Sequence, residues 1–82
     1  MNEEIKDFAI KELSDLKDWI VKNVIIPGEN LKICYFRDGG AKSGLGRQDA
    51  FLETIGNLKT SKTIIEIIDE RMKEIEQQCH NN

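Results

Sequence analysis

The apolar residues of the first twenty-four positions recur at the spacing of an amphipathic helix, and this pattern constrains the fold more than any other feature of the chain. They are Ile5, Phe8, Ala9, Leu13, Leu16, Trp19, Ile20 and Val24. At about 100° per residue these positions cover an arc of roughly 160°, whereas a helix that packs on one neighbour needs a stripe of about 100°. The helix expected over residues 3–25 therefore has apolar surface for two neighbours, and the second can be another subunit.

The length of the chain also points to assembly. Its 82 residues form one domain, which buries only roughly 60–65% of its unfolded surface. Cys34 and Cys79 lie far apart, the N-terminal sequence MNEEIKDF is acidic where a secretory signal is basic, and no apolar run approaches about 18 residues. We therefore expect a cytoplasmic homo-oligomer with reduced thiols and no membrane segment.

The segment VIIPGENLKICYF, which follows the first helix, has two interpretations. Pro27 is expected to end the first helix, because the residue before a proline is pushed out of the helical region. The chain can then form a short β-hairpin at residues 24–36, which gives an α+β fold. Alternatively, Pro27 opens a short helix that Gly39 and Gly40 end. Helix or irregular structure is favoured, because an isolated two-stranded hairpin is marginally stable.

Two helices are predicted in the C-terminal part, at residues 47–55 and 61–78. Gly56 suits the position just after a helix end, although one continuous helix through it would cost only about 1 kcal/mol. The expected fold is thus mainly α, with residues 1–82 as a single domain. In it, a long N-terminal helix packs antiparallel against C-terminal helices, and an irregular glycine-rich segment at 27–46 joins them.

The sequence RDGGAKSGLGRQ, residues 37–48, is the candidate ligand site. It holds four of the six glycines, and residues 27–47 carry four basic and two acidic side chains in a chain of formal net charge −3. Glycines at positive φ let backbone N–H groups converge on an anion, and the following helix would direct its positive end there. The predicted ligand-binding residues are Tyr35, Arg37, Gly39, Gly40, Lys42, Ser43, Gly44 and Arg47.

Each of these assignments has a structural alternative. The glycine spacing matches neither a P-loop nor a dinucleotide-binding motif, and glycine and serine clusters are common in surface connections. Tyr35 would stack on a base in a nucleotide site, but burial preferences favour a core role for the pair Tyr35 and Phe36.

Catalysis and metal binding have little support in the sequence. The single histidine, His80, lies near the C-terminal end, where it has no rigid scaffold for acid–base chemistry. Cys34, Cys79 and His80 offer at most three metal ligands, without a C-x-x-C pair. We expect no enzymatic activity, no metal and no cofactor.

Three binding functions follow from these features. The first hypothesis is a small regulator or inhibitor that assembles as a homo-oligomer and occupies the surface of a partner protein. The second is an oligomer that sequesters a phosphate-bearing small molecule, such as a signalling or cyclic nucleotide, through the basic glycine-rich segment. The third is binding of a single-stranded nucleic acid, since the net negative charge disfavours duplex nucleic acid and anionic membranes.

Overall fold

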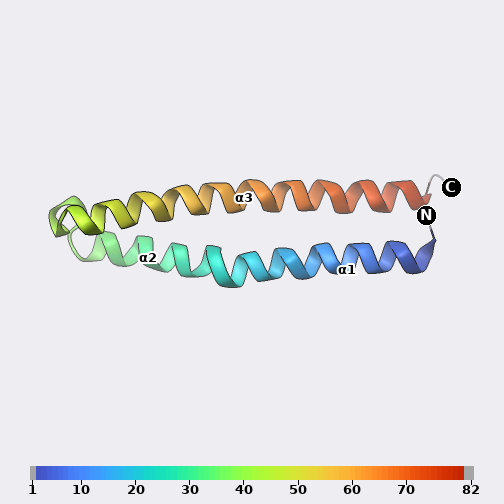
Figure 1. Cartoon of the computed structure of the whole chain (residues 1–82), viewed down its shortest axis with the longest axis horizontal. Helices are drawn as coiled ribbons and strands as arrows, with labels where there is room; N and C mark the ends of the chain where they lie inside the picture. The colour runs from blue at the N-terminus through green and yellow to red at the C-terminus, as the bar shows by residue number, and fades with distance from the viewer. Residues whose placement is uncertain (1, 81–82) are drawn as a thin grey trace.

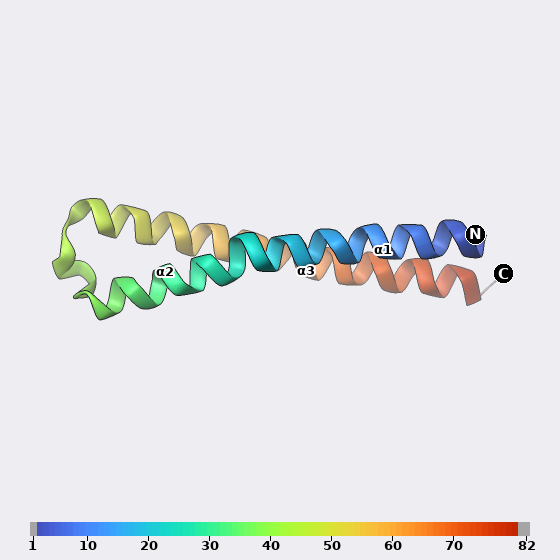
Figure 2. The ribbon, with the colours of Figure 1, turned by 90° about the horizontal axis from the view of Figure 1, so that it is seen from below.

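A computed structural model shows two helical arms joined by a tight turn (Figure 1). It describes residues 2–80, with side chains through residue 78. The elements are α1 (Glu3–Ile20), a π-helical turn (Val21–Ile25), α2 (Ile26–Arg37), a short 3-10 turn (Gly40–Ser43) and α3 (Leu45–His80). The first arm comprises α1, the π-helical turn and α2. It lies alongside α3, with both ends of the chain at one end of the hairpin and the turn at the other (Figures 1 and 2).

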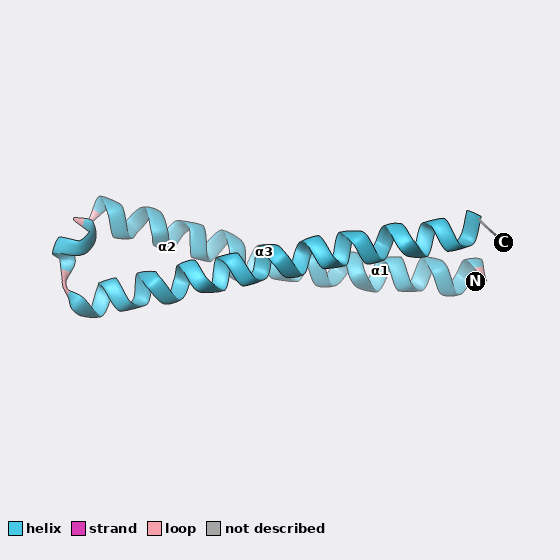
Figure 3. Cartoon of the chain, turned by 90° about the horizontal axis from the view of Figure 1, so that it is seen from above, coloured by secondary structure: helices cyan, strands magenta, loops and turns pink. Residues whose placement is uncertain are grey.

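The expected mainly-α class is confirmed: long N-terminal and C-terminal helical segments pack together. Residues 24–36 are helical, and residues 2–80 contain no strand (Figure 3), so the alternative with a β-hairpin has no support. No helix in this described range is long and apolar enough to cross a membrane. Residence in the cytoplasm stays a prediction.

The first arm does not stop before Pro27, so that expectation is wrong. Five residues in π-helical geometry precede α2, and Pro27 lies in the first turn of α2, where a missing backbone N–H is tolerated. The side-chain amide of Asn23 donates to the carbonyl oxygen of Trp19 at 2.9 Å, next to this wider turn. Helical structure therefore continues to Arg37, and most of the predicted irregular segment at 27–46 is helix.

The C-terminal arm is one continuous helix and not two helices at 47–55 and 61–78. Gly56 lies within α3 and is exposed, and a Cβ atom placed there would meet nothing within 4 Å. The helix therefore continues through Gly56 despite the modest cost of a glycine in a helix interior. The break between two C-terminal helices that the sequence predicts is absent.

The two arms pack closely at Gly28. A Cβ atom at Gly28 would lie 2.7 Å from the Cδ2 atom of Leu58, so only glycine fits this contact without adjustment. Leu58 is one of the few buried apolar side chains; the others are Ile20, Tyr35, Ile68 and Ile75. The core of the hairpin is therefore a single line of side chains between two helices.

Candidate functional site

The predicted ligand-binding residues lie together at the turn end of the hairpin, which we call the tip and define as residues 35–51. Tyr35 and Arg37 lie in the last turn of α2, and Arg47 lies in the first turn of α3. Between them, Gly39, Gly40 and Gly44 adopt φ angles of 112°, 59° and 118°. The hydroxyl group of Ser43 donates to the carbonyl oxygen of Gly40 at 2.6 Å and closes the short turn, and Lys42 is exposed.

The cationic groups of the tip are held by a carboxylate of the tip itself. Asp38 accepts a hydrogen bond from Nη2 of Arg47 at 2.7 Å and a longer one from Nε of Arg37 at 3.4 Å. The hydrogen bond from Arg47 is the main cause that lowers the pKa of Asp38; desolvation opposes it, and the weaker hydrogen bond from Arg37 adds to the lowering. Two of the three predicted phosphate-binding cations therefore share one carboxylate within the chain, and the group of three side chains keeps a net charge of +1. Asp38 is among the acidic residues of the segment counted from the sequence, but this pairing was not predicted.

Tyr35 belongs to a cluster of three aromatic rings. Its ring stacks on that of Phe51 with centroids 4.1 Å apart and planes 8° apart, and Phe36 contacts both rings edge-on. Tyr35 is only 8% exposed, whereas Phe36 is 62% exposed. Phe51 occupies the ring face that a nucleotide base would use, so Tyr35 has the core role considered as its alternative.

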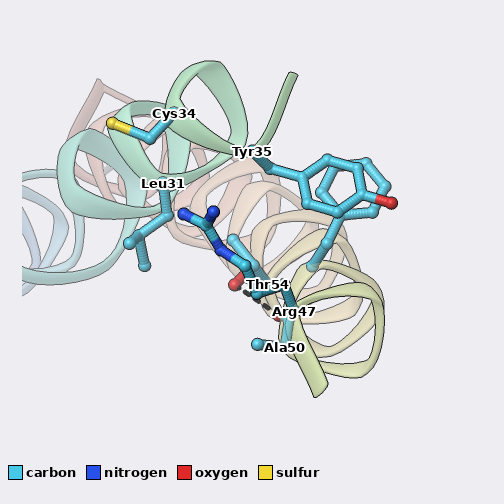
Figure 4. Close-up of a pocket in the computed structure, with 7 residues that line it drawn as sticks. Leu31, Cys34, Tyr35, Arg47, Ala50 and Thr54 are labelled. Atoms are coloured by element: carbon cyan, nitrogen blue, oxygen red, sulfur yellow. Dashed lines mark hydrogen bonds between the residues drawn. The ribbon is translucent and has the colours of Figure 1, made fainter. Parts of the chain in front are cut away.

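A small pocket opens beside this cluster (Figure 4). It has a volume of about 130 Å³ and is lined by Leu31, Cys34, Tyr35, Arg47, Ala50, Phe51 and Thr54. The hydroxyl group of Thr54 donates to the carbonyl oxygen of Ala50 at 2.8 Å and is thus already engaged. Ligand pockets usually measure about 300–1,000 Å³, so this pocket has room for part of a nucleotide only.

The second notable surface lies on α1, toward the end of the hairpin that carries both termini. Ile5, Phe8, Leu16 and Trp19 are 59%, 65%, 48% and 58% exposed. At about 100° per residue these four positions fall within an arc of roughly 80°. They lie on one face of α1 as two pairs, Ile5 with Phe8 and Leu16 with Trp19, with the exposed Glu12 between the pairs. We call these four residues the outer stripe.

Ion pairs between the two arms show which helix positions share a side of the hairpin. Glu29 follows the buried Gly28, and Lys62 follows the buried Ser61. Their side chains form an ion pair at 3.0 Å. Positions that follow a buried residue therefore point to the same side in both arms, because one residue corresponds to about 100° of rotation. Hydrogen bonds from Lys32 and then from Lys62 lower the pKa of Glu29.

Positions that precede a buried residue share the opposite side by the same geometry. Trp19 precedes the buried Ile20, and Ile67, which is 62% exposed, precedes the buried Ile68. Ile64 lies one turn before Ile67 and is 40% exposed. Ile64 and Ile67 thus extend the outer stripe across to α3, and we call the combined surface the apolar side.

The positions that follow inward-facing residues are mostly charged. They include Asp7, Lys11 and Asp18 on α1, and Lys59, Lys62, Glu66, Asp69 and Lys73 on α3. Asp69 also binds Lys17 across the arms at 2.9 Å. The hairpin therefore has one apolar side and one charged side, and it is amphipathic as a unit.

Comparison with protein-family models, with curated proteins and with solved structures gives no match to this chain. Within the described residues, no group of three histidine, cysteine or acidic side chains is placed to hold a metal ion. The side chains of Cys79 and His80 lie outside the described residues.

Proposed function

We propose that this protein is a small non-catalytic regulator or inhibitor, which assembles as a homo-oligomer and acts by occupying the surface of a partner protein. The observation that carries the proposal is the outer stripe: four large apolar side chains, each about half exposed or more, lie on one face of α1. Large exposed apolar side chains gathered on one face and bordered by polar residues, here Glu12, mark protein–protein contact sites in soluble proteins.

The dimensions of the hairpin support assembly. Its radius of gyration is 17.9 Å, whereas a compact domain of 82 residues has a radius of about 12 Å. Its accessible surface is 6138 Å², against about 5,000 Å² for a compact monomer of this size. The surplus of roughly 1,100 Å² is comparable to the 800 Å² that each partner buries in an interface of standard size.

The direction of the pKa shifts of two carboxylates supports a binding role and not a catalytic one. The pKa values of Glu29 and Asp38 are both lowered, because lysine or arginine side chains donate hydrogen bonds to them. A general acid or base needs a pKa near the working pH, and these two groups are shifted away from it.

The second candidate function is capture of a phosphate-bearing small molecule at the tip. One observation favours it: Arg37, Arg47 and three glycines with positive φ lie together beside an aromatic cluster. An anion would have to displace Asp38 from both arginines, so this candidate is the weaker of the two.

Light scattering after size exclusion tests self-association. At tens of micromolar we expect a mass of at least two chains, and a strict monomer would contradict the proposal. Trp19, the only tryptophan, gives a second readout, since its emission should shift to shorter wavelength as chains associate. To test partner binding, the proteins captured by the wild type are compared with those captured by a monomeric variant. A protein that binds the oligomer should be captured by the wild type and not by the monomeric variant.

A further inference from the structure

We propose that a second copy of this chain docks on the outer stripe, with the two α1 helices running in opposite directions and Glu12 at the two-fold axis. This inference rests on the proposed self-association and specifies its geometry. It concerns side chains that the two arms of one chain leave about half exposed or more.

The spacing of the outer stripe carries the directional part of the argument. Ile5 and Trp19 lie seven residues to either side of Glu12, and Phe8 and Leu16 lie four residues to either side. An isologous interface between oppositely directed helices requires a stripe that is the same from both ends. Two α1 helices that cross at Glu12 place Ile5 opposite Trp19 of the second copy, and Phe8 opposite its Leu16.

A parallel arrangement fits the chain less well. Two hairpins that face each other with their tips at the same end place α1 opposite α3 of the second copy. The ion pair between Lys17 and Asp69 fixes which residues of the two arms are level. By this register the position level with Phe8 is Gln78, an exposed polar residue. The parallel arrangement therefore leaves the end of the outer stripe without an apolar neighbour.

The outer stripe supplies most of the area that a stable dimer needs. The exposed parts of its four residues add up to roughly 500 Å² per copy. Standard interfaces bury about 800 Å² per partner, including a polar rim. The stripe therefore forms the apolar part of an interface with one second copy, and the polar side chains beside it form the rim.

Glu12 at the two-fold axis has a basic side chain within reach. Lys17 and Asp69 are level, so Arg71 lies three residues, or about 4.5 Å along the helix axis, from the level of Glu12. Arg71 precedes the half-buried Met72 and thus lies on the apolar side; its Nη1 donates to Glu74 at 3.0 Å. By the same register Glu74 is level with Glu12, so Arg71 is already paired with one carboxylate at the level of the two-fold axis.

This geometry leaves the tips free. The two hairpins overlap along α1 and the C-terminal half of α3, and their tips project from opposite ends of the dimer. The charged sides also face outward, where they are available to a partner protein.

Disulfide trapping tests the crossing point. In a variant with Cys34→Ser and Cys79→Ser, Glu12→Cys should form a covalent dimer under mild oxidation, because residues at a two-fold axis lie within disulfide range. The matched control is Lys11→Cys, which is adjacent and equally solvent-exposed but lies on the charged side. We expect at least ten-fold more covalent dimer from Glu12→Cys than from Lys11→Cys at equal concentration.

The outcomes separate the two proposals. A wild-type chain that is monomeric by light scattering overturns self-association itself. An oligomeric wild type, combined with equal trapping of both cysteine variants or preferential trapping of Lys11→Cys, overturns only the geometry proposed here. Circular dichroism of each variant, with helicity equal to that of the wild type, ensures that trapping reports the native hairpin.

Discussion

The two ends of the hairpin differ in whether their charged and apolar side chains find partners within the chain. At the tip, Asp38 pairs with two arginines, Tyr35 stacks on Phe51, and Phe36 contacts both rings edge-on. Toward the termini, four apolar side chains of α1 lie on one face and stay about half exposed or more among the residues that the structure describes. At the tip, the arginines thus contact Asp38 and the aromatic rings contact each other, whereas the terminal half presents exposed apolar side chains on one face of α1.

This contrast shows that the regularity of exposed groups is more informative than their number. The tip half also exposes apolar side chains, among them Ile33, Leu45 and Leu52. On α2, Ile26, Ile33 and Phe36 also fall within an arc of roughly 80°, but their intervals of seven and three residues are uneven. The outer stripe has the same spacing from both of its ends, as a symmetric interface requires. We therefore assign self-association to the outer stripe.

The largest expected effect is that of Phe8→Glu on association. Burying a phenylalanine stabilises by about 1.5–3 kcal/mol, and a symmetric dimer loses two such contacts, so the dissociation constant should rise roughly 100- to 10,000-fold. Light scattering across a dilution series measures it. The matched control is Ile33→Glu on α2, which is similarly exposed at 61% and should leave the mass unchanged. If both variants associate like the wild type, the stripe is not the interface.

The next effect sharpens the comparison within the core. Gly28→Ala places a methyl group against Leu58, and overpacking costs about 1–3 kcal/mol, of which the better helix propensity of alanine offsets about 1 kcal/mol. We expect a net loss of up to about 2 kcal/mol in urea unfolding at fixed protein concentration. Leu58→Ala in the same chain should relieve the clash, so the two changes should be strongly non-additive. Additive effects would show that the arms do not meet at Gly28.

Gly28 also shows where sequence analysis stops. The periodic apolar residues of α1 predict a helix because side-chain spacing is a local property. Pro-Gly at 27–28 predicts a turn on local grounds, yet here proline lies in a first helical turn and glycine admits a neighbouring helix. The close approach to Leu58 depends on residues thirty positions apart, which local propensity cannot reveal.

A smaller effect is expected at Gly56, in the opposite direction. Its Cβ position is open, its φ angle is not positive and its helix is continuous, so Gly56→Ala should stabilise the chain by about 0.5–1 kcal/mol. The same urea measurement as for Gly28→Ala provides a direct contrast between two helical glycines. A destabilised Gly56→Ala chain would indicate that α3 needs flexibility at this point.

The candidate site was predictable in its composition and not in its electrostatics. The basic residues and glycines of the segment at 37–48 do lie together at the tip, as their closeness in sequence implies. The ion pair between Asp38 and Arg47 depends on how the turn folds back on itself, because nine residues separate the two groups. The signal in the sequence was Asp38 itself, a carboxylate in the same segment that can bind the arginines in place of a phosphate.

The smallest expected effect tests whether the arginines of the tip only stabilise the turn or can also bind an anion. The lowered pKa of Asp38 means that its pairing favours the folded chain above its usual pKa, and this contribution is lost as the pH falls through that value, below about pH 4. Asp38→Asn should therefore weaken the acid sensitivity of unfolding only slightly, because exposed ion pairs contribute little.

The same variant, Asp38→Asn, releases Arg37 and Arg47 without changing the shape of the side chain at position 38. If the tip captures phosphate-bearing molecules, Asp38→Asn should increase the thermal shift produced by mono-, di- and cyclic nucleotides, and Arg47→Ala should abolish it. If neither variant changes the response of the melting temperature, the arginines serve the turn alone and the contrast between the two ends of the hairpin stands.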